Sequence, residues 1–143
     1  MIISRTPLRM SFVGGGTDLE SYYRHGHGAI VSTTIDKYVY IMIDHYYDKD
    51  KIRLSYSRLE EVTDPDNIKH DIIREAIKLT KTPKGIALIV HSEVPSKGSG
   101  LGSSSTFTVG LLNALYAYQG KRKSAHDLAK DASRIEIDIL KNP

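Results

Sequence analysis

The feature that most constrains this chain is a glycine- and serine-rich segment at residues 94–106, which lies between an apolar strand and a helix. Glycine lets main-chain N–H groups approach a ligand closely. The first turn of a helix adds unpaired N–H groups and a positive dipole end. Together these features predict an anion site, most often for phosphate, and any of the hydroxyl groups could also bind Mg²⁺.

Two common phosphate loops do not match this segment. A Walker loop needs Gly-Lys-Ser or Gly-Lys-Thr, and the chain has neither sequence. The dinucleotide fingerprint, counted from Gly98 and Gly100, needs a glycine where Ser103 stands. The plainer alternative is a flexible strand–helix connection that a serine caps. A cap needs only one hydroxyl, however, and this segment has a run of them.

The remaining sequence shows strand periodicity in its first half and helical periodicity in its second half. Strands are expected at 2–13, 29–47 and 52–56, followed later by an apolar strand at 85–94. Helical spacing is expected at 68–77 and at 107–118, where Gly120 ends the helix. Ser124 is expected to cap a last helix, whose inner face would consist of Leu128, Ala132, Ile135 and Ile139. This order predicts an α+β domain, in which the strand tyrosines pack on the sheet.

Composition narrows the class of protein. A length of 143 residues predicts one domain, and the absence of cysteine excludes disulfides, thiolate metal sites and a cysteine nucleophile. The net charge of +3 is modest and the basic run at 121–123 suits a solvated loop, so no nucleic-acid partner is expected. No apolar run approaches the ~20 residues that span a bilayer, and residues 1–9 lack a signal-peptide pattern. We therefore expect a cytoplasmic protein without a membrane partner.

A second unusual segment follows the first predicted strand. This strand delivers Arg9, ends in the three glycines at 14–16, and leads directly into Thr17 and Asp18. Asp18 can accept two hydroxyl hydrogen bonds from a polyol, and Arg9 could face a phosphate or a developing negative charge. The alternative is an ordinary β-turn in which Asp18 caps a helical segment at 19–23.

With both segments in view, the chain resembles the GHMP small-molecule kinases, which include galactokinase, homoserine kinase and mevalonate kinase. Residues 95–106 are similar to the family's phosphate loop, Pro-x-x-x-Gly-Leu-Gly-Ser-Ser. The first segment is similar to the galactokinase pattern Pro-Gly-Arg-x-x-x-x-Gly-Glu-His-Thr-Asp, which is matched at Pro7, Arg9, Gly14, Thr17 and Asp18. Gly15 and Gly16 stand where galactokinases have Glu and His. The Gly-Gly-Gly-Thr-Asp run and residues 31–38 most resemble the D-glycero-D-manno-heptose 7-phosphate kinase branch.

The resemblance implies that residues 1–143 form the N-terminal, ATP-binding domain of such a kinase. The implied fold is a two-layer arrangement of sheet and helices, like that of certain ribosomal proteins, with a left-handed β-α-β unit. The family's catalytic base lies in a Gly-x-x-Asp segment shortly after a metal-binding glutamate, and Asp138 is too close to Glu136 to match it. We therefore expect an incomplete domain, an absent C-terminal domain and no base among these residues.

The resemblance also implies roles for individual residues. ATP would be bound by Lys97, Gly98, Ser99, Gly100, Leu101, Gly102, Ser103, Ser104 and Ser105. Mg²⁺ would be held by Ser104 and Glu136, although Glu136 could instead pair with Arg134 or Lys141. Arg9 would be catalytic, near the transferred phosphoryl group. The sugar would contact Arg9, Gly14, Gly15, Gly16, Thr17 and Asp18.

The function that these expectations favour is phosphoryl transfer from ATP to the anomeric hydroxyl of a heptose 7-phosphate or a related sugar. Three alternatives stay open: a fucose- or galactose-type kinase of the same family, an RNA-binding module of similar fold, and a truncated, non-catalytic binding domain. The substrate would be a small sugar or sugar phosphate. Apolar surface that a second domain would cover also leaves a homo-oligomer open.

Overall fold

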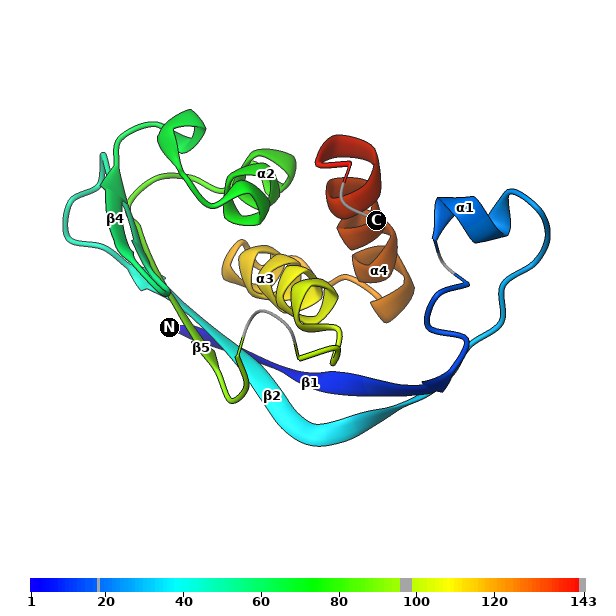
Figure 1. The fold of residues 1–143 in the computed structure, drawn as a ribbon. Coiled ribbons are helices and arrows are strands. Elements are labelled where there is room, and N and C mark those ends of the chain that lie inside the picture. Colours follow the sequence, from blue (N-terminus) through cyan, green and yellow to red (C-terminus); the bar gives the residue numbers. More distant parts are fainter. Residues whose placement is uncertain (18, 96–98, 142–143) are drawn as a thin grey trace.

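The computed structural model describes residues 1–17, 19–95 and 99–141. It contains one five-stranded sheet in the order β1-β2-β5-β3-β4, and the helices α2, α3 and α4 lie together over one face of it (Figure 1). The strands are β1 (Ile2–Val13), β2 (Val31–His45), β3 (Ile52–Ser55), β4 (Leu59–Val62) and β5 (Ile86–Ser92). The longer helices are α2 (Asp71–Thr80), α3 (Ser103–Tyr118) and α4 (Ala125–Ser133). Short turns complete the chain: α1 (Glu20–Tyr23), η1 (Pro65–Asn67) and the π-helix η2 (Arg134–Ile139). The predicted α+β class is confirmed.

The sheet is mixed. β2 pairs antiparallel with β1 and with β5, and β3 pairs antiparallel with β4. β3 and β5 are parallel, and the chain crosses from one to the other through β4 and α2, which forms a β-α-β unit. The period-two pattern of β2 is confirmed, because Val39, Ile41 and Ile43 are buried in the core while the residues between them are not.

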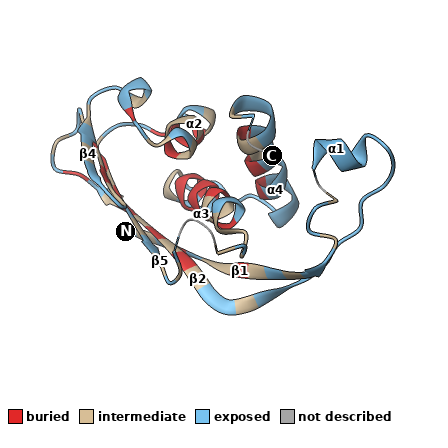
Figure 2. Ribbon diagram, in the orientation of Figure 1, coloured by how far each residue is buried: buried red, intermediate tan, exposed pale blue. Residues whose placement is uncertain are grey.

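Helix α3 lies at the centre of the structure and is buried along most of its length (Figure 2). It packs against β1 and β2 at Gly110, where the hydroxyl of Ser4 donates to the Gly110 carbonyl at 2.8 Å. A Cβ atom at Gly110 would lie only 2.6 Å from the Thr6 hydroxyl oxygen. The close approach of helix and strand therefore depends on a residue without a side chain.

Two local expectations need correction. Strand β4 was not expected from the sequence, because two of its four residues are glutamates. It is an edge strand, where charged side chains are usual. On the last helix, Ser124 caps the N-terminus by accepting from the Asp127 N–H, as expected, but Ile139 is exposed. The π turn of η2 joins the Leu140 N–H to the Ile135 carbonyl, and this wider turn brings Leu140 to the core instead.

Beyond Leu8, β1 and β2 continue as a two-stranded arm, made of residues 10–13 and 31–34, which runs toward α1 (Figure 1). Its apolar side chains are largely exposed, with Phe12 and Val13 each 62% exposed. No helix that the structure describes is both long and apolar enough to cross a bilayer.

Candidate functional site

The glycine–serine segment opens α3 as predicted, but its serines do not cap the helix. The N-cap is Gly102, in the left-handed conformation with φ of 69°, and it provides no side-chain cap. Ser103, Ser104 and Ser105 form the first turn instead. Their N–H groups precede the first backbone bond into the helix, which runs from the Thr106 N–H to the Gly102 carbonyl. This leaves donors and hydroxyls for an anion at the positive end of the helix dipole.

Arg9 lies directly against this segment, although more than ninety residues separate them in sequence. Its backbone N–H donates to the Leu101 carbonyl at 3.2 Å. Its guanidinium donates to the Ser11 hydroxyl at 2.8 Å and covers Gly102, where a Cβ atom would lie 3.1 Å from Arg9 Nε. The structure therefore brings one predicted catalytic group to the predicted phosphate loop.

Glu136 reaches the same first turn from η2. Its carboxylate accepts from the hydroxyl of Ser105 at 3.4 Å and from the hydroxyl of Thr108. Among the described residues it forms no ion pair with Arg134 or Lys141, the partners of the alternative interpretation. Thr108 is fully buried and was missed by sequence reasoning. From the sequence alone, a threonine that donates to a carboxylate cannot be told from one that merely packs inside an apolar helix.

The donor set for a cation here is small. The described residues contain no group of three or more histidine or carboxylate side chains that could hold a metal ion. Ser104 and Glu136 together offer one hydroxyl and one carboxylate, from neighbouring turns of α3 and η2. That set fits Mg²⁺ carried by a phosphate ligand, since Mg²⁺ is usually bound by one or two carboxylates together with substrate phosphates.

A cavity of about 510 Å³ adjoins the start of α3. Ser103 and Ser104 line one side of it, and apolar side chains of β2, β5 and α2 line much of the rest. Tyr56, His70 and Phe107 form its aromatic wall. The ring centroid of His70 lies 5.1 Å from that of Tyr56 and 5.2 Å from that of Phe107. The sequence did not indicate this cavity, because its aromatic residues come from three separate segments.

The electrostatics of this wall favour neutral groups. Burial, with a hydrogen bond to Glu60, raises the pKa of Tyr56 to about 12. Burial also lowers the pKa of His70, and the nearby carboxylates of Asp71 and Glu60 only partly oppose this shift. At neutral pH the Tyr56 hydroxyl and the His70 imidazole are therefore both favoured in their uncharged forms.

The second predicted segment lies at the far end of the arm, roughly 16 Å from Arg9 along an extended strand. Gly14 has φ of 83°, and a Cβ atom there would lie 1.8 Å from the Ala29 carbonyl oxygen, whereas nothing lies within 4 Å of one at Gly16. The Thr17 hydroxyl donates to the Gly14 carbonyl at 2.7 Å, so it closes the turn. Asp18, Lys97 and Gly98 lie outside the described residues.

The predicted site residues thus fall into two groups. Arg9, Ser104, Glu136 and residues 99–103 and 105 lie together at the start of α3, while Gly14, Gly15, Gly16 and Thr17 form a separate turn on the arm. The turn is open at Gly15 and Gly16, where a Cβ atom would meet no contact shorter than 3.9 Å. Their roles in binding stay predictions.

The chain matches known proteins in sequence. Residues 69–143 match the model of the GHMP kinases N terminal domain. The D-glycero-alpha-D-manno-heptose 7-phosphate kinase of Campylobacter jejuni is 33% identical over 97% of this chain, which spans 44% of that relative.

Solved structures show the same fold. The structure of a D-glycero-D-manno-heptose 1-phosphate kinase from Bacteriodes thetaiotaomicron has a TM-score of 0.85 at 24% identity, over all of this chain and 50% of that one. The mevalonate kinase of Methanococcus jannaschii has a TM-score of 0.78 at 20% identity, over 99% of this chain and 47% of that one. The chain spans about half the length of these relatives. From the family match over more than half of its residues, the chain belongs to the GHMP kinases.

Proposed function

We propose that this protein is an ATP-dependent sugar kinase in which the start of α3 binds the phosphates. The observation that carries the proposal is that Ser103 and Ser104 belong at once to the open first turn of a helix and to the lining of the aromatic cavity. A ligand that fits both must join a polyanion to a flat, apolar ring. A nucleoside triphosphate has that form.

Catalysis of phosphoryl transfer is mainly positioning and charge stabilisation. The first-turn N–H groups and hydroxyls of α3 would orient the phosphates, and the Arg9 guanidinium would stabilise negative charge beside Gly102. Ser104 and Glu136 would hold Mg²⁺. When bound, Mg²⁺ would supply positive charge that offsets the charge of the phosphates.

The acceptor in this proposal is a sugar phosphate, namely the anomeric hydroxyl of a heptose 7-phosphate. The support is the 33% identity to the heptose 7-phosphate kinase over nearly the whole chain. The turn at Gly14 would receive the sugar, with the carboxylate of Asp18 accepting its hydroxyl groups. Fucose- and galactose-type sugars are the competing acceptors within the same family.

The proposal is tested first by calorimetric titration of nucleotide. The protein is expected to bind Mg·ATP, and Ser104→Ala is expected to weaken Mg·ATP more than metal-free ATP, because only the metal complex uses the hydroxyl as a ligand. Ser133→Ala, an exposed serine on α4, is the matched control and should change neither titration. Equal losses in both titrations would remove the metal role of Ser104, and failure of the unaltered protein to bind ATP would overturn the proposal.

The acceptor is tested separately by calorimetric titration of the protein with a panel of sugars and sugar phosphates. Heptose 7-phosphate is expected to bind most tightly. Equal affinity for unphosphorylated galactose would contradict the heptose assignment while leaving the kinase proposal in place.

A further inference from the structure

The inference concerns the hydroxyl of Thr108, which lies inside α3 one turn after Ser104. The side chain is fully buried, so its hydroxyl needs partners within the protein. Two acceptors lie within its reach: the Glu136 carboxylate on η2 and the Ser104 carbonyl at 3.0 Å. A hydroxyl has a single proton, and the carboxylate is the stronger of the two acceptors. Thr108 therefore donates mainly to Glu136, and it contacts both of the residues that are proposed to hold Mg²⁺.

The two carboxylate oxygens of Glu136 are held differently. Oε1 accepts from the buried hydroxyl of Thr108. Oε2 lies 3.4 Å from the hydroxyl of Ser105, a distance beyond the usual range of about 2.5–3.0 Å for a hydroxyl donor. Ser105 is also exposed. One oxygen is thus fixed from inside the protein, while Oε2 is only weakly engaged and faces the exposed first turn of α3.

The backbone that carries Glu136 is fixed as well. The preceding residue, Ile135, is fully buried, and its carbonyl accepts from the Leu140 N–H at 2.9 Å to close the π turn of η2. Single π turns within helices are frequent at functional sites. The freedom that remains to the carboxylate is rotation of its own side chain, and the hydrogen bond from Thr108 restricts that rotation.

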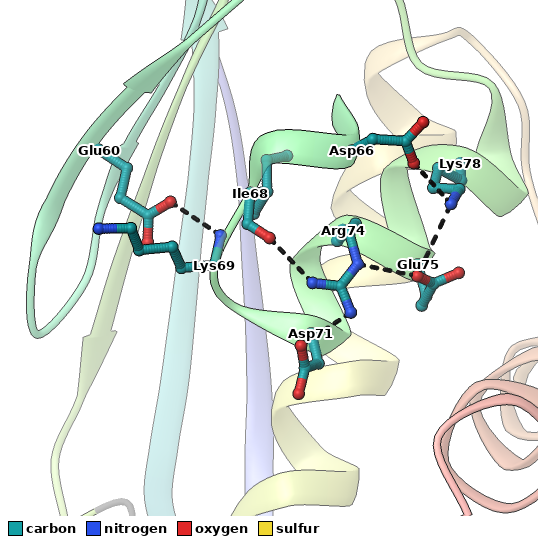
Figure 3. A network of polar contacts seen from close by, with 8 residues as sticks. All are labelled: Glu60, Asp66, Ile68, Lys69, Asp71, Arg74, Glu75 and Lys78. Carbon is teal, nitrogen blue, oxygen red and sulfur yellow. Dashed lines mark hydrogen bonds and ion pairs between the residues drawn. The ribbon is translucent and has the colours of Figure 1, made fainter. Parts of the chain in front are cut away.

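The carboxylates of α2 show the opposite arrangement (Figure 3). There the Arg74 guanidinium donates to Asp71 at 2.8 Å and to Glu75 at 3.0 Å, so a cation of the protein offsets the negative charge. In the part of the chain that the structure describes, Glu136 forms no such ion pair, and its partners are hydroxyl groups. A neutral hydroxyl orients a carboxylate without cancelling its charge, which leaves that charge for a cation that a ligand brings.

We propose that Thr108 is a positioning residue for Glu136: its hydroxyl fixes Oε1 and so leaves Oε2 for the Mg²⁺ that accompanies the phosphates. The inference rests on the proposed nucleotide binding. Groups that hydrogen-bond to a metal-binding side chain orient it, and their loss typically lowers metal affinity by about 10–100-fold. The role depends on the hydroxyl of residue 108 and not on its bulk, so serine is expected to retain it and valine to lose it.

The test compares calorimetric titrations of Mg·ATP and of metal-free ATP. Thr108→Val, which has nearly the same shape, is expected to weaken Mg·ATP binding by about tenfold and to leave metal-free ATP binding nearly unchanged. Thr108→Ser is expected to bind Mg·ATP almost as the unaltered protein does. Thr80→Val is the matched control and should change neither titration. Thr80 is likewise buried in a helix, but its hydroxyl bonds to the Ala76 carbonyl at 2.8 Å and to the Thr82 hydroxyl instead of to a carboxylate.

A double-mutant cycle tests whether Thr108 acts through Glu136. Once Glu136→Ala has removed the carboxylate, adding Thr108→Val is expected to cause no further loss of Mg·ATP affinity, because the two residues form one unit. If Thr108 only supported the packing of α3, its substitution would weaken both forms of ATP alike, and its effect would add to that of Glu136→Ala.

The outcomes separate the two proposals. If the unaltered protein binds no ATP, the proposed function fails and this inference fails with it. If the unaltered protein binds ATP but Thr108→Val keeps the full affinity for Mg·ATP, or weakens both forms alike, the role of Thr108 is overturned and nucleotide binding stands. An additive loss in the double variant has the same meaning. Should Thr108→Val lack a cooperative thermal transition, Thr108→Ala removes the same hydroxyl, and its two titrations decide in the same way.

Discussion

The two glycine-rich segments of this protein differ in how far other elements pack against them. Residues 99–105 open α3, which is buried along most of its length by the sheet and by α2 and α4. Residues 14–17 lie at the end of the two-stranded arm, where Phe12, Val13 and Val31 are each about 60% exposed. Figure 2 shows the contrast, with buried residues concentrated in α3 and few along the arm.

This difference in packing explains how many side chains are held in place at each segment. At α3, packing from several elements holds Gly102 against Arg9 and places Glu136 beside Ser105. At the arm, the turn is closed mostly by its own atoms, through Thr17 and the Gly14 carbonyl. A glycine-rich motif therefore predicts a binding site in either place, but among the described residues the start of α3 has the larger set of partners from other elements.

The largest expected effect tests the burial of α3 directly. Leu111 is fully buried in that helix, so Leu111→Ala is expected to lower the free energy of unfolding by about 3 kcal/mol through lost contacts and a cavity. Phe12→Ala on the arm removes a larger side chain, yet it is expected to change the free energy of unfolding by less than about 0.5 kcal/mol. Urea denaturation of both variants measures the difference, and equal losses would contradict the contrast between the two regions.

The second prediction places the same substitution in each segment. Gly14→Ala and Gly102→Ala both put a side chain at positive φ, which costs about 1–2 kcal/mol for a residue other than glycine. Gly102→Ala also presses on Arg9 and is expected to weaken Mg·ATP binding by about tenfold or more. Gly14→Ala collides with the Ala29 carbonyl and is expected to weaken sugar-phosphate binding while Mg·ATP binding stays unchanged.

Gly16→Ala is the control for this pair, because a Cβ atom there meets nothing within 4 Å. It should behave like the unaltered protein in the Mg·ATP titration and in urea denaturation. Loss of Mg·ATP binding in Gly14→Ala would show that the arm and the start of α3 form one site instead of two.

The sequence predicted most of the fold because regular elements leave a local pattern. The strand expected at 2–13 coincides with β1, and the cap at Ser124 and the stop at Gly120 both leave local signals that the structure bears out. Strand β4 was missed because Glu60 and Glu61 oppose a strand pattern. In the structure these glutamates bind groups that come from other segments, including the Tyr56 hydroxyl and the Lys51 ammonium.

The candidate site was predicted in part. The glycine–serine segment and Arg9 stood out because their residue types are unusual in those positions. The cavity did not, since Tyr56, His70 and Phe107 each look like ordinary packing residues when taken one segment at a time. Their meeting in one cavity wall depends on tertiary contact, which a local pattern does not contain. The same holds for Thr108, whose hydroxyl is paired with Glu136 across two helices.

A third, smaller effect is pH-dependent and belongs to the cavity alone. Burial holds the pKa of His70 below its ordinary value of 6.5, so the unfolded chain takes up that proton at a higher pH than the folded chain. The free energy of unfolding is therefore expected to fall as the pH drops below about 6.5, and this contribution levels off once the pH is under the folded pKa.

Urea denaturation at about pH 7.5 and about pH 5 measures this effect. His70→Phe removes the group, so its loss of stability between the two pH values should be smaller than that of the unaltered protein. His27→Phe replaces an exposed histidine near the arm and should leave the pH dependence as it was. An unchanged pH dependence in His70→Phe would contradict the lowered pKa of His70 in the folded protein.

The smallest expected effect on stability comes from the substitutions that test whether the arm is a surface for association. β1 is one of the two edge strands of the sheet, and its exposed end carries Phe12 and Val13. An open strand edge beside apolar side chains favours pairing with a second copy of the chain.

Replacing Phe12 with serine and Val13 with threonine together is expected to change the free energy of unfolding by less than about 0.5 kcal/mol, yet to lower the mean mass that light scattering measures. Leu59→Ser, at a residue 64% exposed on β4, removes a similar apolar group from the opposite edge of the sheet and should not lower that mass. A mean mass that responds to the β4 variant, or to neither variant, would show that the exposed apolar surface of the arm does not drive association.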